Sequence, residues 1–143
     1  MKTQTPKLSK VDRVIAVDQA SSDYQIKLTP EETKEFLQRA EIYNRIPKTI
    51  ALIVDQIDAI TPRAYYNPDN PNNGSQIFNF RVGNEGSRVL YLEVRAPFGL
   101  PKDFDWLEYE RKLTEIGKTF DADEIDTLEN KPAYKLTIRF WWD

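Results

Sequence analysis

The sequence of 143 residues contains no cysteine and no histidine. The first absence excludes disulfides and thiolate nucleophiles, and the two together exclude the usual structural zinc sites. Without imidazole the chain also lacks the most common general base and the side chain that most readily changes charge near neutral pH. Carboxylates, lysine, tyrosine and serine could still serve an enzyme. These absences nevertheless favour a non-enzymatic protein, and the sequence predicts no cofactor and no metal.

Long apolar runs are missing as well. The longest one, residues 50–54, is far shorter than the roughly 20 residues that cross a bilayer. The opening segment, MKTQTPKLSK, lacks the apolar core of a secretory signal. We therefore expect a cytoplasmic protein with no membrane partner.

The residues that are present have the balance of a globular domain, 40% hydrophobic and 30% charged. A chain of this length buries about two-thirds of its unfolded surface, which is enough for one core without disulfides or metals. Residues 1–10 are polar and have no periodicity, so we expect a flexible N-terminal arm there. A single α+β domain is expected over residues 11–143.

The segment 48–60, KTIALIVDQIDAI, predicts a buried helix. Starting at Ile50, its aliphatic residues recur at i, i+3, i+4, i+7 and i+10, which places them on one stripe of a helix. Its β-branched residues weakly favour a strand, but thirteen residues are long for a strand. We expect the rest of the chain to pack around this helix.

A helix start lies just before it, at Thr29. Thr29 can cap the amide of Glu32, Glu32 can bond back to the amide of Thr29, and Pro30 suits the first helical position. Pro47 ends this helix near residue 45 or 46. The predicted buried face comprises Phe36, Leu37, Ala40 and Tyr43.

A third helix is predicted from Asp105, because Glu108 follows three residues later in the same capping pattern. Gly117 is expected near its fraying end. Its apolar face comprises Trp106, Leu113, Ile116 and Phe120. Residues 121–130 are acidic and mixed, and they predict either a short helix or a loop.

Two hairpins are expected in the first two-thirds of the chain. Residues 11–17, VDRVIAV, are rich in β-branched side chains and residues 24–28 alternate, so we interpret them as paired strands. A helix through Leu8, Val11 and Ile15 is the alternative for the first of these. Residues 76–82 and 87–95 predict a second hairpin with its turn at 83–86.

The register of the second hairpin depends on that turn. If Val82 faces Ser87, Phe78 and Phe80 share a side with Val89 and Tyr91. The other side then carries Ile77, Leu90, Leu92 and Val94, with Asn79, Arg81 and Arg88 near the turn.

Residues 133–142 give the strongest strand signal, a strict period of two. One side carries Tyr134, Leu136, Ile138, Phe140 and Trp142, and the other carries Lys135, Thr137, Arg139 and Trp141. The predicted fold is thus an antiparallel sheet of about four or five strands packed by three helices, in the order ββααββαβ.

A basic and aromatic sheet face is the first candidate binding site. If the charged sides of the strands coincide, they offer cations to phosphates and an indole to stacking bases. The alternative is an ordinary solvent-exposed face. The residues concerned are Arg81, Arg88, Lys135, Arg139 and Trp141.

A long loop is the second candidate. Residues 61–75, TPRAYYNPDNPNNGS, are rich in proline and asparagine and are too polar for a helix or strand. Loops of this length are uncommon inside compact domains, and Tyr65 and Tyr66 are the aromatic type that binding loops use. A structural crossover with both tyrosines packed at the edge of the core is the alternative.

The acidic stretch from Asp103 to Glu129 has ten carboxylates against three cations. Asp121, Asp123 and Glu124 could hold Mg²⁺ if they converge, or the stretch could mimic a phosphate backbone. Caps and solvated helix faces explain it equally well.

The C-terminal strand offers a further surface. Trp141 is left on its charged side, where an exposed indole suggests a contact. If the strand lies at an edge, it could pair with a partner strand or with a second copy of the chain.

Together these features predict a non-catalytic interaction module that binds another macromolecule through its sheet face or its loops. The net charge of −3 favours a protein partner over nucleic acid. The alternative is a nucleic-acid-binding accessory protein, and the third hypothesis is a carboxylate–metal-dependent phosphodiesterase.

Overall fold

A computed structural model describes residues 9–21, 23–39, 50–63, 76–96, 103–132 and 134–143. The elements follow in the order α1 (Lys10–Ala20), β1 (Asp23–Leu28), α2 (Pro30–Arg39), α3 (Leu52–Ile60), β2 (Phe78–Glu85), β3 (Arg88–Arg95), α4 (Trp106–Thr119), β4 (Glu124–Lys131) and β5 (Lys135–Trp142).

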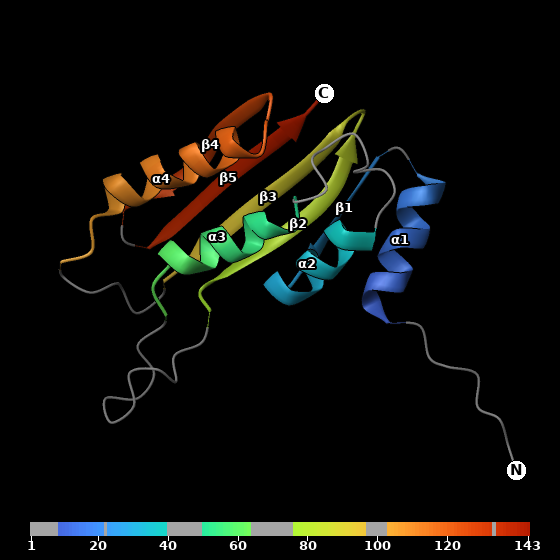
Figure 1. The fold of residues 1–143 in the computed structure, drawn as a ribbon, viewed down its shortest axis with the longest axis horizontal. Coiled ribbons are helices and arrows are strands. Elements are labelled where there is room, and N and C mark those ends of the chain that lie inside the picture. Colours follow the sequence, from blue (N-terminus) through green and yellow to red (C-terminus); the bar gives the residue numbers. More distant parts are fainter. Residues whose placement is uncertain (1–8, 22, 40–49, 64–75, 97–102, 133) are drawn as a thin grey trace, which may run out of the picture.

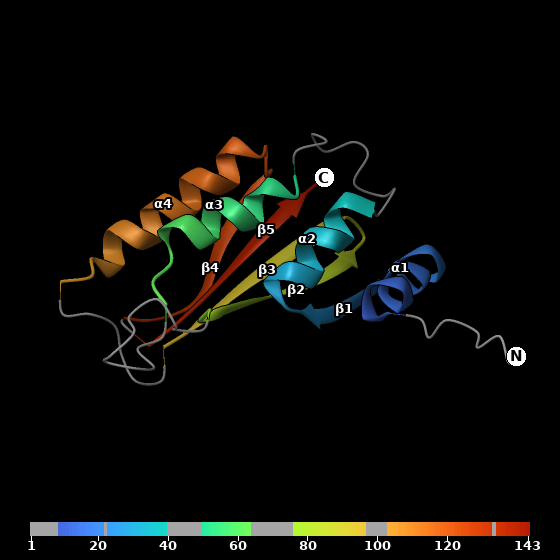
Figure 2. The ribbon, with the colours of Figure 1, turned by 60° about the horizontal axis from the view of Figure 1, so that its bottom comes forward.

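The molecule has two layers, a sheet and a layer of helices. The five strands are all antiparallel, in the order β1-β2-β3-β5-β4. Helices α2, α3 and α4 cover one face of the sheet, and α1 lies beside α2 at the β1 edge (Figures 1 and 2). The predicted α+β class with an antiparallel sheet is confirmed, although the described residues contain four helices rather than three.

The additional helix is α1, in a segment for which the sequence predicts a strand. Ser9 accepts a hydrogen bond from the amide of Asp12 at 3.1 Å, and the Ser9 amide donates to the Asp12 carboxylate at 3.0 Å. This capping box fixes the helix start. Val11 and Val14 are then buried three residues apart on one face of the helix. The β-branched composition misled the prediction, because a local cap and tertiary burial outweigh strand propensity.

Helices α2 and α3 follow the predicted pattern. Thr29 and Glu32 form the expected reciprocal cap, at 3.0 and 3.1 Å. In α3 the stripe of Ile53, Val54 and Ile57 is buried against the sheet. The predicted end of the first of these helices, with Ala40 and Tyr43, lies outside the described residues.

The register of the β2–β3 hairpin differs from the prediction. β2 continues to Glu85 and the chain turns at Gly86, which adopts a φ of +81°, so Val82 pairs with Leu90. The shift is an odd number of residues, and it therefore exchanges the faces of one strand relative to the other. Phe78 and Phe80 share the buried face with the leucines of β3, whereas Val89 and Tyr91 point the other way.

Residues 121–130, expected as a short helix or loop, instead form most of β4, an edge strand with a bulge between Thr127 and Glu129. Helix α4 packs closely over this part of the sheet at Gly117. A Cβ there would lie 2.7 Å from Ile125 and from Phe140. Gly117 is thus a buried contact point rather than the frayed end that we predicted, and the helix continues to Thr119.

The core lies between the two layers. From β2, β3 and β5 the side chains of Phe80, Leu92 and Ile138 are all fully buried. All large apolar side chains of these strands point to the helices except Val89, Tyr91 and Trp141. No described helix covers the other face of the sheet (Figure 2).

Candidate functional site

The uncovered sheet face, here called the open face, is formed by the strand residues that alternate with the core. Strand register brings together residues from all five strands into rows that run across the sheet. In the described strands the cationic side chains of this face are Lys27, Arg81, Arg95, Lys131, Lys135 and Arg139. The carboxylates are Asp23, Glu85, Glu93, Glu124, Asp126 and Glu129.

The centre of the open face is apolar and aromatic. Val89 is fully buried and Tyr91 is only 6% exposed, although no described helix lies over them. Trp141 is the cross-strand partner of Val89, and Arg139 is that of Tyr91. Long neighbouring side chains on the same face therefore provide the cover that a helix provides on the other face.

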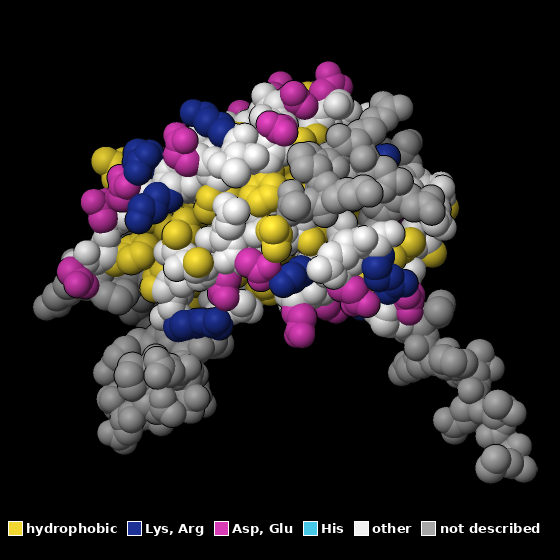
Figure 3. Space-filling model, in the orientation of Figure 1, with side chains coloured by type: hydrophobic (Ala, Val, Ile, Leu, Met, Phe, Trp, Pro, Cys, Tyr) yellow, Lys and Arg dark blue, Asp and Glu magenta, His cyan; other side chains and the backbone are white. Residues whose placement is uncertain are grey.

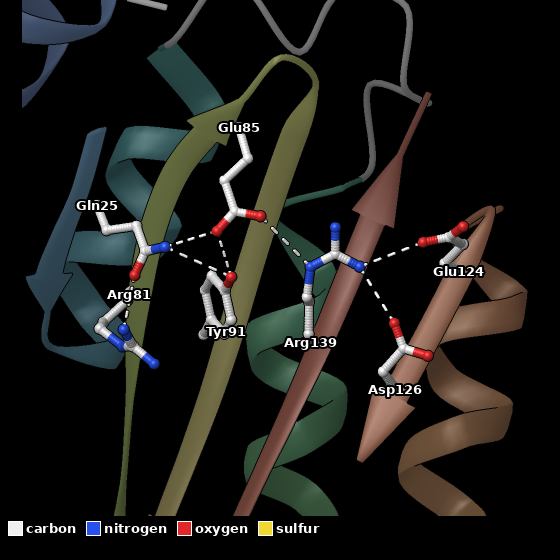
Figure 4. Close-up of polar contacts among 7 residues, drawn as sticks. All are labelled: Gln25, Arg81, Glu85, Tyr91, Glu124, Asp126 and Arg139. Atoms are coloured by element: carbon white, nitrogen blue, oxygen red, sulfur yellow. Dashed lines mark hydrogen bonds and ion pairs between the residues drawn. The ribbon is translucent and has the colours of Figure 1, made fainter. Parts of the chain in front are cut away.

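Arg139 is the centre of the polar network on this face (Figure 4). Its Nη1 donates to Glu124 at 3.3 Å and to Asp126 at 3.1 Å, and its Nε lies 3.5 Å from a carboxylate oxygen of Glu85. The guanidinium carbon also lies 5.6 Å from the ring centroid of Trp141. Contacts with three carboxylates and an indole fix this side chain in place, and it is only 17% exposed.

Arg81 and Tyr91 form the other half of the network. Arg81 donates to Glu93 at 2.7 Å and to Gln25 at 2.6 Å, and its guanidinium lies over the Tyr91 ring at 4.4 Å. The Tyr91 hydroxyl donates to Glu85, which also accepts from Gln25. Burial, together with the Glu85 carboxylate, raises the pKa of Tyr91. Tyr91 is therefore a protonated donor near neutral pH and not a base.

A glycine in β2 allows the close approach of β1 that brings Gln25 into this network. A Cβ at Gly83 would lie 2.3 Å from the backbone oxygen of Tyr24 in the neighbouring strand. The absence of a side chain lets β1 approach, which brings Gln25 within reach of Glu85.

Four of the predicted sheet residues do lie together on the open face: Arg81, Lys135, Arg139 and Trp141. Arg88 does not, because the register shift turns it to the helix side. There its charge lies near Asp18. Burial raises the pKa of the Asp18 carboxyl above its usual value, and a hydrogen bond from Tyr24 and the charge of Arg88 oppose part of this rise. The predicted grouping of Arg88 with the open face was wrong.

The sequence prediction missed the acceptors and the hydrogen-bonding partners on this face, which are Gln25, Glu85, Tyr91, Glu124 and Asp126. The alternation of residues 24–28 had already marked Gln25 as a residue pointing away from the core. The others required the register and the strand order. Tyr65 and Tyr66, the loop candidates, lie outside the described residues.

The acidic stretch does not form a metal site in the described part of the chain, where no group of three or more acidic residues is close enough to share a cation. Glu124 pairs with Arg139, and Asp123 accepts from the amide of Asp143 at 2.7 Å. On α4, Asp105 caps the amide of Glu108 at 3.0 Å, and Glu108 itself pairs with Arg111. These carboxylates have structural partners.

Among the described residues, the helix side shows no single charged patch. In Figure 3 carboxylates and cations are interspersed over the helices, which is unlike the continuous negative surface of a phosphate mimic. A hollow of about 420 Å³ between α2 and α3 is lined by charges that already pair, Lys34 with Asp55 at 2.8 Å and Arg63 with Asp58 at 3.4 Å.

The C-terminal strand is an inner strand. β5 pairs with β3 on one side and with β4 on the other along most of its length. The backbone of β5 is therefore already hydrogen-bonded, and association through its edge is not available. In the described residues the free edges belong to β1 and β4.

Comparisons with protein-family models, with curated proteins and with solved structures each gave no match. In the described part of the chain no helix has both the length and the apolar character needed to span a membrane. The chemistry of the open face is therefore the basis for a functional proposal.

Proposed function

We propose that this protein is a non-catalytic interaction module that binds another protein through the open face of its sheet. The observation that carries the proposal is the arrangement of this face, with Tyr91 and Trp141 at its centre and charged side chains around them. Tyrosine, tryptophan and arginine dominate the energetic centres of protein interfaces, and a polar rim surrounds them.

The charge of the open face supports a protein partner over nucleic acid. Its six cations are matched by six carboxylates, so the face as a whole is neutral. Arg139, the cation best placed beside Trp141, contacts three carboxylates, and a phosphate would have to displace them. Nucleic-acid affinity depends mainly on an excess of cations toward the phosphates, and this face lacks such an excess.

The test is affinity capture from the native source with the full chain as bait, with and without nuclease treatment. We expect a protein that is retained by the wild type after nuclease treatment and lost with Trp141→Ala or Glu124→Arg. Glu124 is exposed at the margin of the face, so its replacement changes the surface with little effect on the core.

The matched control is Leu107→Ala, which removes an apolar side chain that is 76% exposed on the helix side. Thermal unfolding of each variant shows whether it remains folded. Equal retention by Trp141→Ala, Glu124→Arg and the control would refute binding through the open face. Loss of the captured protein after nuclease treatment, with binding that weakens steeply in salt and on Arg139→Ala or Lys135→Ala, would favour the nucleic-acid alternative.

A further inference from the structure

Three cations stand side by side at the end of the open face away from the β2–β3 turn. Arg95 of β3 lies directly opposite Lys135 of β5, and Lys135 lies directly opposite Lys131 of β4. We call these three residues the basic row. They come from strands that are neighbours in space, although Arg95 lies 36 residues from Lys131 and 40 residues from Lys135 in the sequence.

Such a row costs stability. Like charges directly opposite each other on adjacent strands repel, and the usual arrangement alternates their signs. In the described residues Glu129 is the only carboxylate that forms an ion pair with the row, at 2.9 Å from Lys135 and 3.7 Å from Lys131. Arg95 has no ion pair within that part of the chain, so the basic row keeps an excess of two positive charges.

Elsewhere on the open face Lys27 also lies opposite Arg81, but the arginines there have carboxylate partners. Arg139 has three carboxylates around it and Arg81 has Glu93. The opposite end of the face, beside the β2–β3 turn, is acidic, with Asp23 paired across from Glu85. The open face is therefore neutral as a whole but polarised along its strands.

The basic row is accessible to a partner. Lys131 is 71% exposed at the side chain, and Arg95 is exposed as well. The row therefore combines unneutralised charge with exposure to solvent, as charged side chains at the margin of a protein interface do.

We infer that the basic row is where the protein partner is anchored, and that it takes an acidic segment of that partner carrying two or more neighbouring Asp or Glu carboxylates. This inference rests on the proposed protein-binding function and adds the partner's chemistry and orientation. The two carboxylates would neutralise the excess charge of the row, and the partner's acidic segment would be directed away from the acidic end of the face. Complementarity of this kind governs orientation and association rate.

The experiment measures the binding of a fluorescein-labelled hexaglutamate peptide to the full chain by fluorescence anisotropy at low ionic strength. The test variant is Arg95→Ala with Lys131→Ala, which keeps the contact between Lys135 and Glu129. The matched control is Lys112→Ala with Lys118→Ala, because it makes the same change in net charge at two exposed lysines of α4, away from the open face.

We expect the test variant to weaken peptide binding about three- to tenfold, the range for two exposed charge contacts, and the control to change it little. Undetectable binding to the wild type, or equal effects of both double variants, would overturn the inference. A single-stranded oligonucleotide of the same charge that binds as tightly as the peptide and depends equally on the row would also overturn it, because phosphate rather than carboxylate would then be the ligand.

A stability measurement gives an independent readout. If the row is a binding device retained at a cost, Arg95→Gln should raise the thermal unfolding midpoint at low salt and have less effect at high salt. A lowered midpoint would mean that Arg95 stabilises the fold, contrary to the inference. If the row proves inert while capture of a partner still depends on Trp141, the inference fails and the proposed function remains.

Discussion

The two faces of the sheet come from the same five strands but are built by different means. On the helix face, Phe80, Leu92 and Ile138 are fully buried against α2, α3 and α4. On the open face their immediate neighbours Arg81 and Arg139 lie over aromatic rings and pair with carboxylates. Successive residues of one strand therefore belong in turn to a close-packed core and to a polar network.

The difference shows for which face the need for folding stability explains the amino-acid composition. Burial of apolar side chains supplies most of the folding free energy, and it accounts for the composition of the helix face. Surface ion pairs contribute little on average, so stability alone does not explain why the open face carries twelve charged side chains and a tryptophan. The proposed binding role would account for that composition.

The largest effect is expected from the helix face. Phe80→Ala would leave a cavity at a position with no exposure, next to the edge-to-face contact with Phe78. We predict a loss of about 3–5 kcal/mol in the free energy of unfolding, measured by urea denaturation. A loss below about 1 kcal/mol would mean that the helix face is not the tightly packed layer described here.

Two glycines allow the two sides of the sheet to be compared by the same substitution, glycine to alanine. Gly83 lies on the open face, and Gly117 lies in α4 on the helix side. Gly83→Ala would place a methyl group 2.3 Å from the Tyr24 backbone oxygen, whereas Gly117→Ala would meet side-chain atoms of Ile125 and Phe140 at 2.7 Å. Because side chains can shift more easily than a paired strand, we predict a loss of about 2–3 kcal/mol at Gly83 and about 1–2 kcal/mol at Gly117. Urea unfolding of both variants measures the order, and the reverse order would contradict the pairing of β1.

Removal of Arg139 tests the network of the open face. Arg139→Ala would leave Glu85, Glu124 and Asp126 without their shared cation, and we predict a loss of about 1–2 kcal/mol, intermediate between exposed and buried ion pairs. The matched control is Arg111→Ala on α4, whose partner Glu108 is exposed, and it should cause no measurable change. Equal losses in urea unfolding would mean that the network does not hold Arg139 more firmly than an ordinary surface pair.

The smallest effect concerns the edge of the helix layer, where an ion pair between Arg39 and Asp12 adds to the apolar packing of α1. The hydrogen bond from Arg39 and those from Ser9 lower the pKa of the Asp12 carboxyl from 3.8 to about 2. Because the folded-state pKa is lowered, the stabilisation is present above about pH 4 and is lost as the pH falls toward 2.

We therefore predict that Asp12→Asn is slightly less stable than the wild type at neutral pH and that the two proteins converge near pH 2. Thermal unfolding as a function of pH measures this difference. A gap that stays constant across that range would show that the charge of Asp12 is not the cause.

The elements that could be predicted from the sequence were those with local signals. The aliphatic stripe of α3, the reciprocal cap at Thr29 and the alternation of β5 depend on neighbours within a few residues, and the structure confirms all three. The cap at Ser9 was an equally local signal, but a preference based on β-branched residues obscured it.

The open face could be predicted only in part, because it depends on pairing between distant segments. The alternation of β5 placed Lys135, Arg139 and Trp141 on one side correctly. Arg88 was misplaced because the position of one turn decides the face of a whole strand. The acidic composition of residues 121–130 gave no strand signal, since β4 is an edge strand that buries little of its surface.

The position of β5 also has a consequence for how the chain folds as it is synthesised. β4 leaves the ribosome before β5, yet its pairing within the sheet is with β5 alone. The strands β1, β2 and β3 can therefore pair while the acidic β4 segment still lacks its partner, and β5 then inserts between β3 and β4. The charges of Glu124, Asp126 and Glu129 would keep that waiting segment soluble and discourage it from pairing with the wrong neighbour.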